Sequence, residues 1–384
     1  MIRTMNIPSK LPDTGITIFT QMTRLAQENG AINLSQGFPD FNTDPKLIEL
    51  VGHHMRIGHN QYAPMQGVPV LRERIAEKIK ELYHADCNPE TFITITSGAT
   101  EALFCAISTI VHHHDEIIIF EPAFDSYLPA VRLHGGIPVF VKLQYPDYTI
   151  DWDEVRKKIS PRTKAIILNS PHNPTGTVIG SQDIIQLQKI IQNHDLLIIS
   201  DEVYEHIIFD QIPHEGILRY PDLAARSFVI SSFGKTYHTT GWKIGYCVAP
   251  PPLTDEFRKI HQYVTFASNT PIQYAYAEIM EEKDYYHKLA VFYQHKRDLF
   301  QSLLQDSRFT TLPCRGTYFQ MMEYSKISTE PDTVFAGRLT TEYGVAAIPP
   351  SVFYHTKDDH KVLRFCFAKT DDTLKKAAEI LCRI

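Results

Sequence analysis

The middle of the chain alternates short, nearly continuous apolar runs with stretches of helical periodicity. Runs of Ile, Leu and Val are typical of strands that are buried on both faces of a sheet. Seven such strands are predicted, at residues 92–96, 116–120, 139–141, 164–168, 196–200, 228–231 and 245–249. Helices are predicted between them, for example at 101–111, 153–158 and 181–193. This alternation predicts an α/β fold with a mostly parallel sheet that helices flank.

The two ends of the chain show a different pattern. Residues before about 45 have weak periodicity, a long helical stretch runs from about 272 to 304, and a smaller α+β pattern follows. We therefore expect an N-terminal arm at 1–45 that forms part of a small domain, a large domain at 46–285, and a C-terminal small domain at 286–384. The boundary between the last two is placed inside the long helical stretch.

Small and polar residues cluster directly after five of the predicted strands. These loops are residues 97–100, 121–124, 169–174, 201–204 and 231–235. Ligands of open α/β sheets bind at the carboxyl ends of the strands. The five loops therefore predict a single ligand site at that edge of the sheet.

Three of these loops carry residues with a specific chemical use. The small residues 97–100 open a helix whose free N–H groups suit a phosphate, although an ordinary helix cap has the same composition. Lys235 can form an imine, although most loop lysines are surface charges. Asp201 ends a buried strand and needs a cationic or hydrogen-bonding partner, although it could also cap a helix.

Composition and charge narrow the class of protein. The 384 residues carry a net charge of −6, which does not favour a nucleic-acid or membrane partner. Residues 1–7 lack the apolar run of a secretory signal, and no segment has the length of a membrane span. The six cysteines include no CxxC pair, and there is no HExxH spacing, so we expect no metal site and a cytoplasmic location. The glycine-rich signatures of dinucleotide and nucleoside-triphosphate sites are absent as well.

The motifs taken together resemble those of the fold-type I, class I aminotransferases that depend on pyridoxal 5′-phosphate (PLP). The matching segments are Asn60-Gln61-Tyr62 and residues 97–102, 121–127, 171–176, 200–204 and 232–236. They occur in the order and approximate spacing of that family. Segments 35–41, 241–245 and 363–367 are most similar to the branch of methionine aminotransferase, kynurenine aminotransferase and glutamine transaminase K. The resemblance implies a PLP-dependent transferase fold of type I with a seven-stranded sheet.

The resemblance also implies a role for each matching residue. Lys235 would hold PLP as a Schiff base, Asp201 would pair with the pyridine nitrogen, and Asn173 and Tyr204 would bond the phenolic oxygen. Phe124 would stack on the ring. The phosphate would be held by Gly98, Ala99, Thr100, Ser232 and Lys243, and by Tyr62 of the neighbouring subunit of a homodimer. The sequence departs from the wider family at Lys243, where many relatives have arginine, and at Gly234, where serine is common.

The substrate site follows from the same resemblance. Arg364 would bind the substrate carboxylate beside Gly37 and Asn173, and segment 16–19 with Ile18, Tyr62 and Phe353 would line the side-chain pocket. No second arginine can be assigned to a distal carboxylate. We therefore expect transfer of the amino group of a neutral, large or aromatic L-amino acid to a 2-oxo acid. Methionine is expected first, with phenylalanine, histidine, glutamine and kynurenine as further candidates.

Two other functions are compatible with the same cofactor residues. A PLP-dependent carbon–sulfur β-lyase of cysteine conjugates shares nearly all of them. A PLP-binding regulator without catalysis is the more remote alternative, since such regulators usually carry a DNA-binding domain for which we expect no room in this chain.

Overall fold

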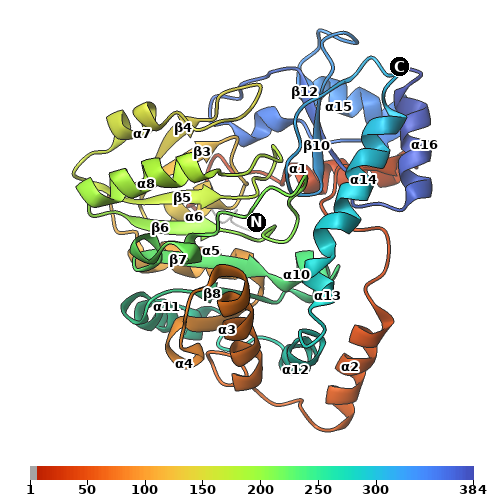
Figure 1. Cartoon of the computed structure of the whole chain (residues 1–384). Coiled ribbons are helices and arrows are strands. Elements are labelled where there is room, and N and C mark those ends of the chain that lie inside the picture. The colour runs from red at the N-terminus through yellow and green to blue at the C-terminus, as the bar shows by residue number, and fades with distance from the viewer. Residues whose placement is uncertain (1–6) are drawn as a thin grey trace, which may run out of the picture.

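The main sheet lies at the centre of the large part of the molecule (Figure 1). The computed structural model describes residues 7–384, so residues 1–6 of the predicted arm lie outside the described residues. The strand order is β2-β8-β7-β6-β5-β3-β4. The strands are β2 (Ile93–Thr96), β3 (Glu116–Glu121), β4 (Ile137–Lys142), β5 (Thr163–Asn169), β6 (Leu197–Asp201), β7 (Ser227–Ser232) and β8 (Gly245–Val248). Among these strands, β8 alone runs opposite to the other six, so the predicted mostly parallel seven-stranded sheet is confirmed.

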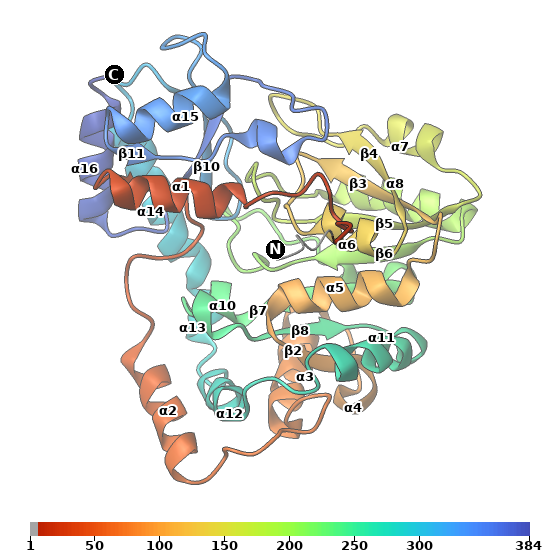
Figure 2. The same ribbon diagram turned by 180° about the vertical axis from the view of Figure 1, so that it is seen from behind.

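Helices cover both faces of this sheet and bury its apolar side chains. One face packs against α5 (Gly98–Ile110), α6 (Tyr127–Leu133) and α11 (Pro251–Val264), which lie in front of the strands in Figure 2. The other face is covered by α3 (Pro69–Tyr83), α7 (Trp152–Lys158), α8 (Ser181–Asn193) and α12 (Thr270–Ile279). The shorter elements around the sheet are α2 (Pro45–Arg56), α4 (Pro89–Phe92), α9 (Pro221–Ala224), α10 (Phe233–Thr236), η1 (Ile217–Arg219) and η2 (Thr240–Trp242). Burial on both faces explains why the strands are nearly continuous runs of Ile, Leu and Val.

A second apolar cluster joins the two ends of the chain. Strand β1 (Ile32–Asn33) pairs in parallel with β11 (Val345–Ala346), and α1 (Ile18–Glu28) packs against α15 (Asp332–Thr341). The antiparallel sheet β12-β10-β9 completes this part with two more helices and a 3-10 turn. Their bounds are β9 (Thr310–Thr311), β10 (Phe319–Glu323), β12 (Val362–Cys366), α14 (Leu289–Leu303), α16 (Asp371–Leu381) and η3 (Pro350–Phe353). The N-terminal segment therefore packs with the C-terminal part, while the domain boundaries at 45 and 285 stay a prediction.

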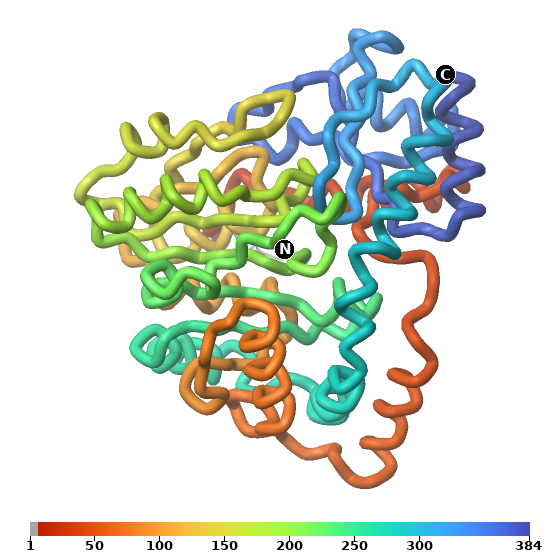
Figure 3. The backbone as a smooth tube through the Cα atoms, viewed as in Figure 1, coloured from red at the N-terminus to blue at the C-terminus, as the bar shows by residue number. Residues whose placement is uncertain are grey.

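The prediction of one long helix over about 272–304 is wrong. The chain forms three helices there, α12, α13 (Asp284–His287) and α14, which step along one side of the molecule as the cyan part of the tube in Figure 3. The break falls at the exposed, charged residues Glu281–Lys283. Lys283 donates to Glu81 of α3 at 2.5 Å, which holds the turn against the large part of the molecule. Periodicity of apolar residues does not reveal so short a turn, because the pattern resumes after it.

None of the helices in the described part of the chain is both long enough and apolar enough to cross a membrane.

Candidate active site

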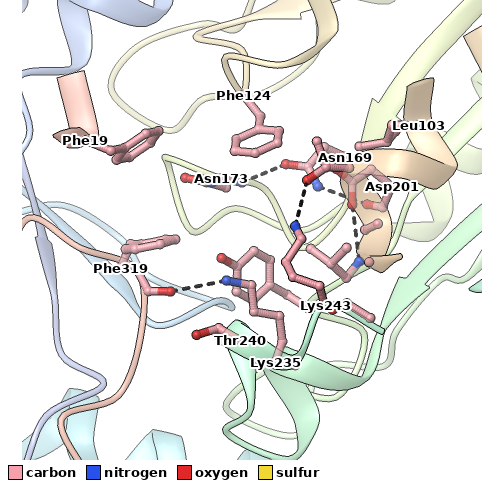
Figure 4. Close-up of a pocket in the computed structure, with 18 of the residues that line it drawn as sticks. Phe19, Leu103, Phe124, Asn169, Asn173, Asp201, Lys235, Thr240, Lys243 and Phe319 are labelled. Atoms are coloured by element: carbon pink, nitrogen blue, oxygen red, sulfur yellow. Dashed lines mark hydrogen bonds between the residues drawn. The ribbon is translucent and has the colours of Figure 1, made fainter. Parts of the chain in front are cut away.

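A cavity of about 260 Å³ lies at the carboxyl ends of the strands of the main sheet. It is lined by the strand-end loops and by Phe19, Gly37, Phe319 and Arg364 from the two ends of the chain. Figure 4 shows Phe19 and Phe319 on the opposite side of the cavity from Asn169 and Asp201. The cavity brings together most of the residues that the sequence predicts for the site. These residues are Gly37, Gly98, Ala99, Thr100, Phe124, Asn173, Asp201, Tyr204, Ser232, Lys235, Lys243 and Arg364.

Lys235 lies in the short helix α10, which directly follows β7. Its Nζ donates to the hydroxyl of Tyr318 at 2.9 Å and to the carbonyl oxygen of Gly37 at 3.2 Å. Burial lowers the pKa of Lys235 to about 8, because a charged ammonium loses hydration in the cavity. About a tenth of this lysine is therefore a neutral amine at pH 7, far more than for an ordinary lysine, and the neutral amine is the form that acts as a nucleophile or base.

Asp201 ends the buried strand β6, and its carboxylate is held from two sides. Oδ2 accepts a hydrogen bond from the hydroxyl of Tyr127 at 2.6 Å, and Oδ1 accepts one from the N–H of Val203 at 3.3 Å. Burial raises the pKa of Asp201 to about 6, although these hydrogen bonds oppose the shift. Asn169 supports the same loop, since its side chain donates to the carbonyl oxygen of Asp201 and accepts from the N–H of Asn173. The site thus holds a buried carboxylate that a cationic ligand group would stabilise.

The N-terminus of α5 forms a cradle for an anion. The helix begins at Gly98, which has φ +76°, and the first N–H groups of a helix have no partner inside it. A Cβ at Gly98 would lie 3.2 Å from Nζ of Lys243, so glycine lets this lysine approach the helix end closely. Lys243 donates to the hydroxyl of Thr100 at 3.4 Å. A cation, free N–H groups and hydroxyls together suit a phosphate group.

Gly234 departs from the residue that is common in the wider family, and the packing explains the glycine. A Cβ at this position would lie 3.0 Å from Cα of Thr240 and 3.2 Å from the carbonyl oxygen of Thr239. The turn after α10 therefore packs too closely for a larger residue without a shift of the backbone.

Arg364 lies in β12 and is completely buried. Its guanidinium donates to Oδ1 of Asn173 and to the carbonyl oxygen of Ser35, both at 2.8 Å, and it lies 3.9 Å from the ring centre of Phe319. Burial lowers its pKa to about 10, so it stays charged at neutral pH. Its Nε is buried without a hydrogen-bond partner among the described residues. A buried, incompletely paired guanidinium at a cavity is suited to bind a carboxylate.

Three predicted site residues do not line the cavity. Phe353 is buried with its ring centre 5.8 Å from that of Phe19, and Ile18, in the first turn of α1, packs against the second apolar cluster. Of segment 16–19 it is Phe19 that reaches the cavity. Tyr62 is 85% exposed and packs edge-on against Phe266 at 5.5 Å, away from the cavity of its own chain.

The sequence did not single out several residues that the structure brings to the site. Tyr127 stands inside the matched segment 121–127 and Asn169 opens the predicted loop 169–174, but the sequence analysis assigns neither of them a role. Tyr318 and Phe319 lie just before and at the start of β10, and only the fold brings them near Lys235 and Arg364. Further residues line the cavity without a predicted role, and they include Gln36, Leu103, Val203, Thr240 and Ile244.

A buried ion pair fixes the loop that carries Tyr204. Glu205 accepts from Nζ of Lys78 at 2.8 Å and from the hydroxyl of Ser231 at 2.8 Å, and it also bonds the hydroxyl of Tyr83. Burial opposes the ionisation of Glu205, but Lys78 and His206 hold its pKa below its usual range. The pair thereby ties the end of β6 to the end of β7 and to α3.

Replacement of Lys78 by methionine should lower the free energy of unfolding by about 3–5 kcal/mol, because it leaves the Glu205 carboxylate buried without its cation. Urea unfolding of the purified variant measures this loss. Lys80→Met is the matched control, since Lys80 lies on the same helix in an exposed pair with Asp86 and should change stability by no more than about 1 kcal/mol. Equal losses in the two variants would contradict the importance of burial.

The comparison with known proteins agrees with this geometry. Residues 29–381 match the model of the family "Aminotransferase class I and II". The chain is 51% identical to the methionine aminotransferase of Escherichia coli over 97% of both chains. It is also 35% identical to the kynurenine–oxoglutarate transaminase of Dictyostelium discoideum, over 98% of this chain and 96% of the relative.

A solved structure gives the same result for the fold. A protein from Escherichia coli, for which a methionine aminotransferase function was identified, superposes with a TM-score of 0.97 at 50% identity and covers 99% of this chain and 100% of its own. The fold predicted from the resemblance is therefore confirmed, as is the expected enzyme class. The chain, with a buried lysine, a buried carboxylate and an arginine around one cavity, belongs to the class I and II aminotransferases.

Proposed function

We propose that the enzyme uses PLP to move the amino group of a neutral, large L-amino acid, with methionine preferred, to a 2-oxo acid. The observation that carries this proposal is the single buried guanidinium of Arg364, which lies between the aromatic rings of Phe19 and Phe319 at the cavity. Among the described residues, Arg364 is the only arginine that lines this cavity. Its guanidinium can bind one carboxylate, and the aromatic rings beside it suit an uncharged substrate side chain.

The residues present fit PLP group by group. The cradle at Gly98, Thr100 and Lys243 suits its phosphate, and the buried Asp201 suits a protonated ring nitrogen. Lys235 is close enough to the same cavity to bond its aldehyde carbon, and Phe124 supplies an aromatic face. Bound there, PLP would supply an electron sink for the electrons released at the substrate Cα.

The chain's own residues then perform three tasks. Arg364 fixes the substrate carboxylate and so gives every α-amino acid the same orientation of its Cα–H bond. The neutral amine of Lys235 takes the proton from Cα and delivers it again within the cavity. Asp201 keeps the proton on the ring nitrogen, because the cation relieves the cost of burying its carboxylate.

The apolar wall supports a preference for an uncharged substrate side chain. Phe19 and Phe319 flank Arg364, with its guanidinium 5.2 Å and 3.9 Å from their ring centres, and Leu103 and Phe124 lie across the cavity. Methionine suits such a wall, since its flexible thioether makes favourable contacts with aromatic rings. The methionine aminotransferase among the relatives supports the same choice.

An exposed apolar surface around Tyr62 supports the proposed homodimer. Tyr62 and Tyr263 are 85% and 86% exposed, and Phe266 and Ile57 are exposed close to them in sequence or space. Clusters of this kind are typical of protein–protein interfaces. In the proposed dimer, Tyr62 reaches the phosphate site of the partner subunit.

The free cysteines of the described residues are compatible with the proposed cytoplasmic location.

Substrate profiling of the purified enzyme tests the proposal. We expect kcat/KM for methionine to exceed that for aspartate by at least about 100-fold, because among the described residues Lys235 and Lys243 are assigned to PLP and, besides Arg364, no further cation lines the cavity to compensate the distal carboxylate of aspartate. Transfer is measured as 2-oxo acid formed from each amino donor in the presence of a 2-oxo acid acceptor. Faster use of aspartate would refute the neutral pocket.

The comparisons do not favour the lyase alternative, and pyruvate release from a cysteine conjugate without an acceptor measures it directly.

Replacement of Arg364 by lysine should raise KM about 100-fold for every amino donor, because lysine cannot form the paired hydrogen bonds of a guanidinium. The effect should be similar for methionine and phenylalanine, which share the carboxylate but differ in side chain. Steady-state kinetics with both donors measure it. A change confined to one donor would place Arg364 in the side-chain pocket instead.

A further inference from the structure

The amine of Lys235 lies in a closed triangle of hydrogen bonds. Nζ donates to the hydroxyl of Tyr318 at 2.9 Å and to the carbonyl oxygen of Gly37 at 3.2 Å. The hydroxyl of Tyr318 donates to that same carbonyl oxygen at 2.5 Å. Two of the N–H bonds of the amine therefore have fixed acceptors. Two acceptors fix the orientation of the amine and not only its position.

The direction of these hydrogen bonds follows from the state of Tyr318. The residue is 1% exposed, and burial together with the neighbouring Tyr204 holds its pKa well above the usual range, so the hydroxyl keeps its proton. With that proton committed to Gly37, the oxygen is left as an acceptor for Lys235. The ring is held in place by Tyr204, Phe319 and Tyr293, with ring centres at 5.2, 4.9 and 5.6 Å.

The three residues come from three separate parts of the chain. Lys235 follows β7 of the main sheet, Gly37 lies between β1 and α2, and Tyr318 directly precedes β10. The amine is thus supplied by the large sheet but oriented by the two segments that form the second apolar cluster. The direction of its lone pair depends on how these segments sit against the sheet.

Orientation matters because a base must point its lone pair at the proton that it takes. In a neutral amine with two N–H bonds engaged by Tyr318 and Gly37, the lone pair lies on the side away from those acceptors. Lys235 lines the cavity and Tyr318 does not, so this lone pair can meet the Cα of a substrate bound in the cavity. A lysine without the triangle would rotate among several directions, and few of them would be productive.

We propose that Tyr318 is a positioning residue for amino transfer, which together with the carbonyl oxygen of Gly37 holds the amine of Lys235 whenever that amine is not bonded to the cofactor. The inference rests on the proposed function for Lys235. It adds a residue to the reaction that neither touches the substrate nor lines the cavity.

The test compares Tyr318→Phe with Tyr293→Phe. Both variants lose one buried hydroxyl from the same aromatic cluster, but the hydroxyl of Tyr293 has no hydrogen-bond partner among the described residues. Each enzyme is first treated with methionine and freed of 2-oxo acid, so that the cofactor carries the amino group and Lys235 is free. Trace acylation with acetic anhydride across a pH series, read by mass spectrometry of the Lys235 peptide, then gives the pKa of the lysine.

Tyr318→Phe should lower the pKa of Lys235, because an oxygen that accepts from the ammonium is lost, whereas Tyr293→Phe should leave it unchanged. The other titratable groups around this amine stay in place in both variants, and they include Asp201, Tyr204, Lys243, Arg364 and Cys366. In a single half-reaction with methionine, Tyr318→Phe should be about 10- to 100-fold slower, with a larger isotope effect for deuterium at Cα and an unchanged KM. The visible spectrum of the resting enzyme should be the same in all three proteins.

Three outcomes would overturn the inference. An unchanged pKa of Lys235 in Tyr318→Phe refutes the triangle, and equal effects of the two variants show that only packing was disturbed. A slower half-reaction without a larger isotope effect shows that Tyr318 acts on another step. If the wild-type protein takes up no PLP, the proposed function itself fails, and the pKa comparison on the cofactor-free full chain still decides the contact between Tyr318 and Lys235.

Discussion

Replacement of Lys235 by alanine is expected to lower the rate of amino transfer by about 10⁴-fold, the upper end of what a positioned base contributes. The large effect has two causes in the structure. Among the described residues, the amine of Lys235 alone combines burial, a pKa lowered to about 8 and a place in the cavity with the anion cradle and Arg364. Its loss removes both the proposed bond to the cofactor and the base at Cα. The measurement is the single half-reaction with methionine, followed by absorbance.

Lys235→Arg separates charge from basicity in this experiment. Arginine keeps a cation in the cavity but does not lose its proton near neutral pH, so this variant should be as inactive as Lys235→Ala. A small primary amine added to the solution should restore part of the activity of Lys235→Ala, because the vacated space admits it, and none of the activity of Lys235→Arg. Activity of Lys235→Arg within tenfold of the wild type would refute Lys235 as the base.

Replacement of Asp201 by asparagine should lower the rate of the half-reaction by about 10²–10³-fold, the size of a preorganised electrostatic contribution. Asparagine keeps the shape of the side chain, and the hydroxyl of Tyr127 can still donate to its amide oxygen. What is lost is the negative charge that would keep a proton on the cofactor ring. Tyr127→Phe, which keeps the charge and removes only that donor, should cost about tenfold. An equal loss in both variants would mean that the hydrogen bond matters and the charge does not.

Asp201→Asn should slow the half-reaction, but it should stabilise the cofactor-free chain at high pH. Burial raises the pKa of Asp201 from 3.8 to about 6, so between these values the folded state holds a proton that the unfolded state has released. The contribution of Asp201 to stability is therefore present below about pH 4 and is lost as the pH rises through 6. Cofactor-free Asp201→Asn should exceed the wild type in melting temperature at pH 8, and the difference should shrink as the pH falls to 4. A difference that grows toward low pH would contradict the raised pKa.

The strands and the strand-end loops could be predicted from the sequence because their signals are local. Burial on both faces produces continuous apolar runs, and parallel strands bring their carboxyl ends to one edge. Once the runs are located, residues such as Asp201 and Lys235 are expected near each other, and the cavity contains both. The resemblance added Arg364, whose place in β12 no local pattern indicates.

The residues that escaped prediction depend on contacts between distant segments. No sequence pattern around Tyr318 indicates a role for its hydroxyl. Only the fold brings that hydroxyl within hydrogen-bond distance of Lys235. Phe19 and Ile18 are neighbours at the start of a helix, and the direction of α1 alone decides which one reaches the cavity. The turn at Glu281–Lys283 was missed because the apolar pattern continues on both sides of it.

The pairing of β1 with β11 has a consequence for the synthesis of the chain. Ile32 is synthesised long before its partner Val345, because the whole main sheet lies between them in the sequence. During that interval the main sheet can be completed, since its last strand ends at Val248, whereas α1 and β1 have no surface to pack on. Gly37 and Arg364 can therefore come together at the cavity only after Arg364 has been synthesised. Until then the apolar face of α1 and β1 lacks the later segments that cover it in the folded chain, so we expect it to be exposed in the growing chain.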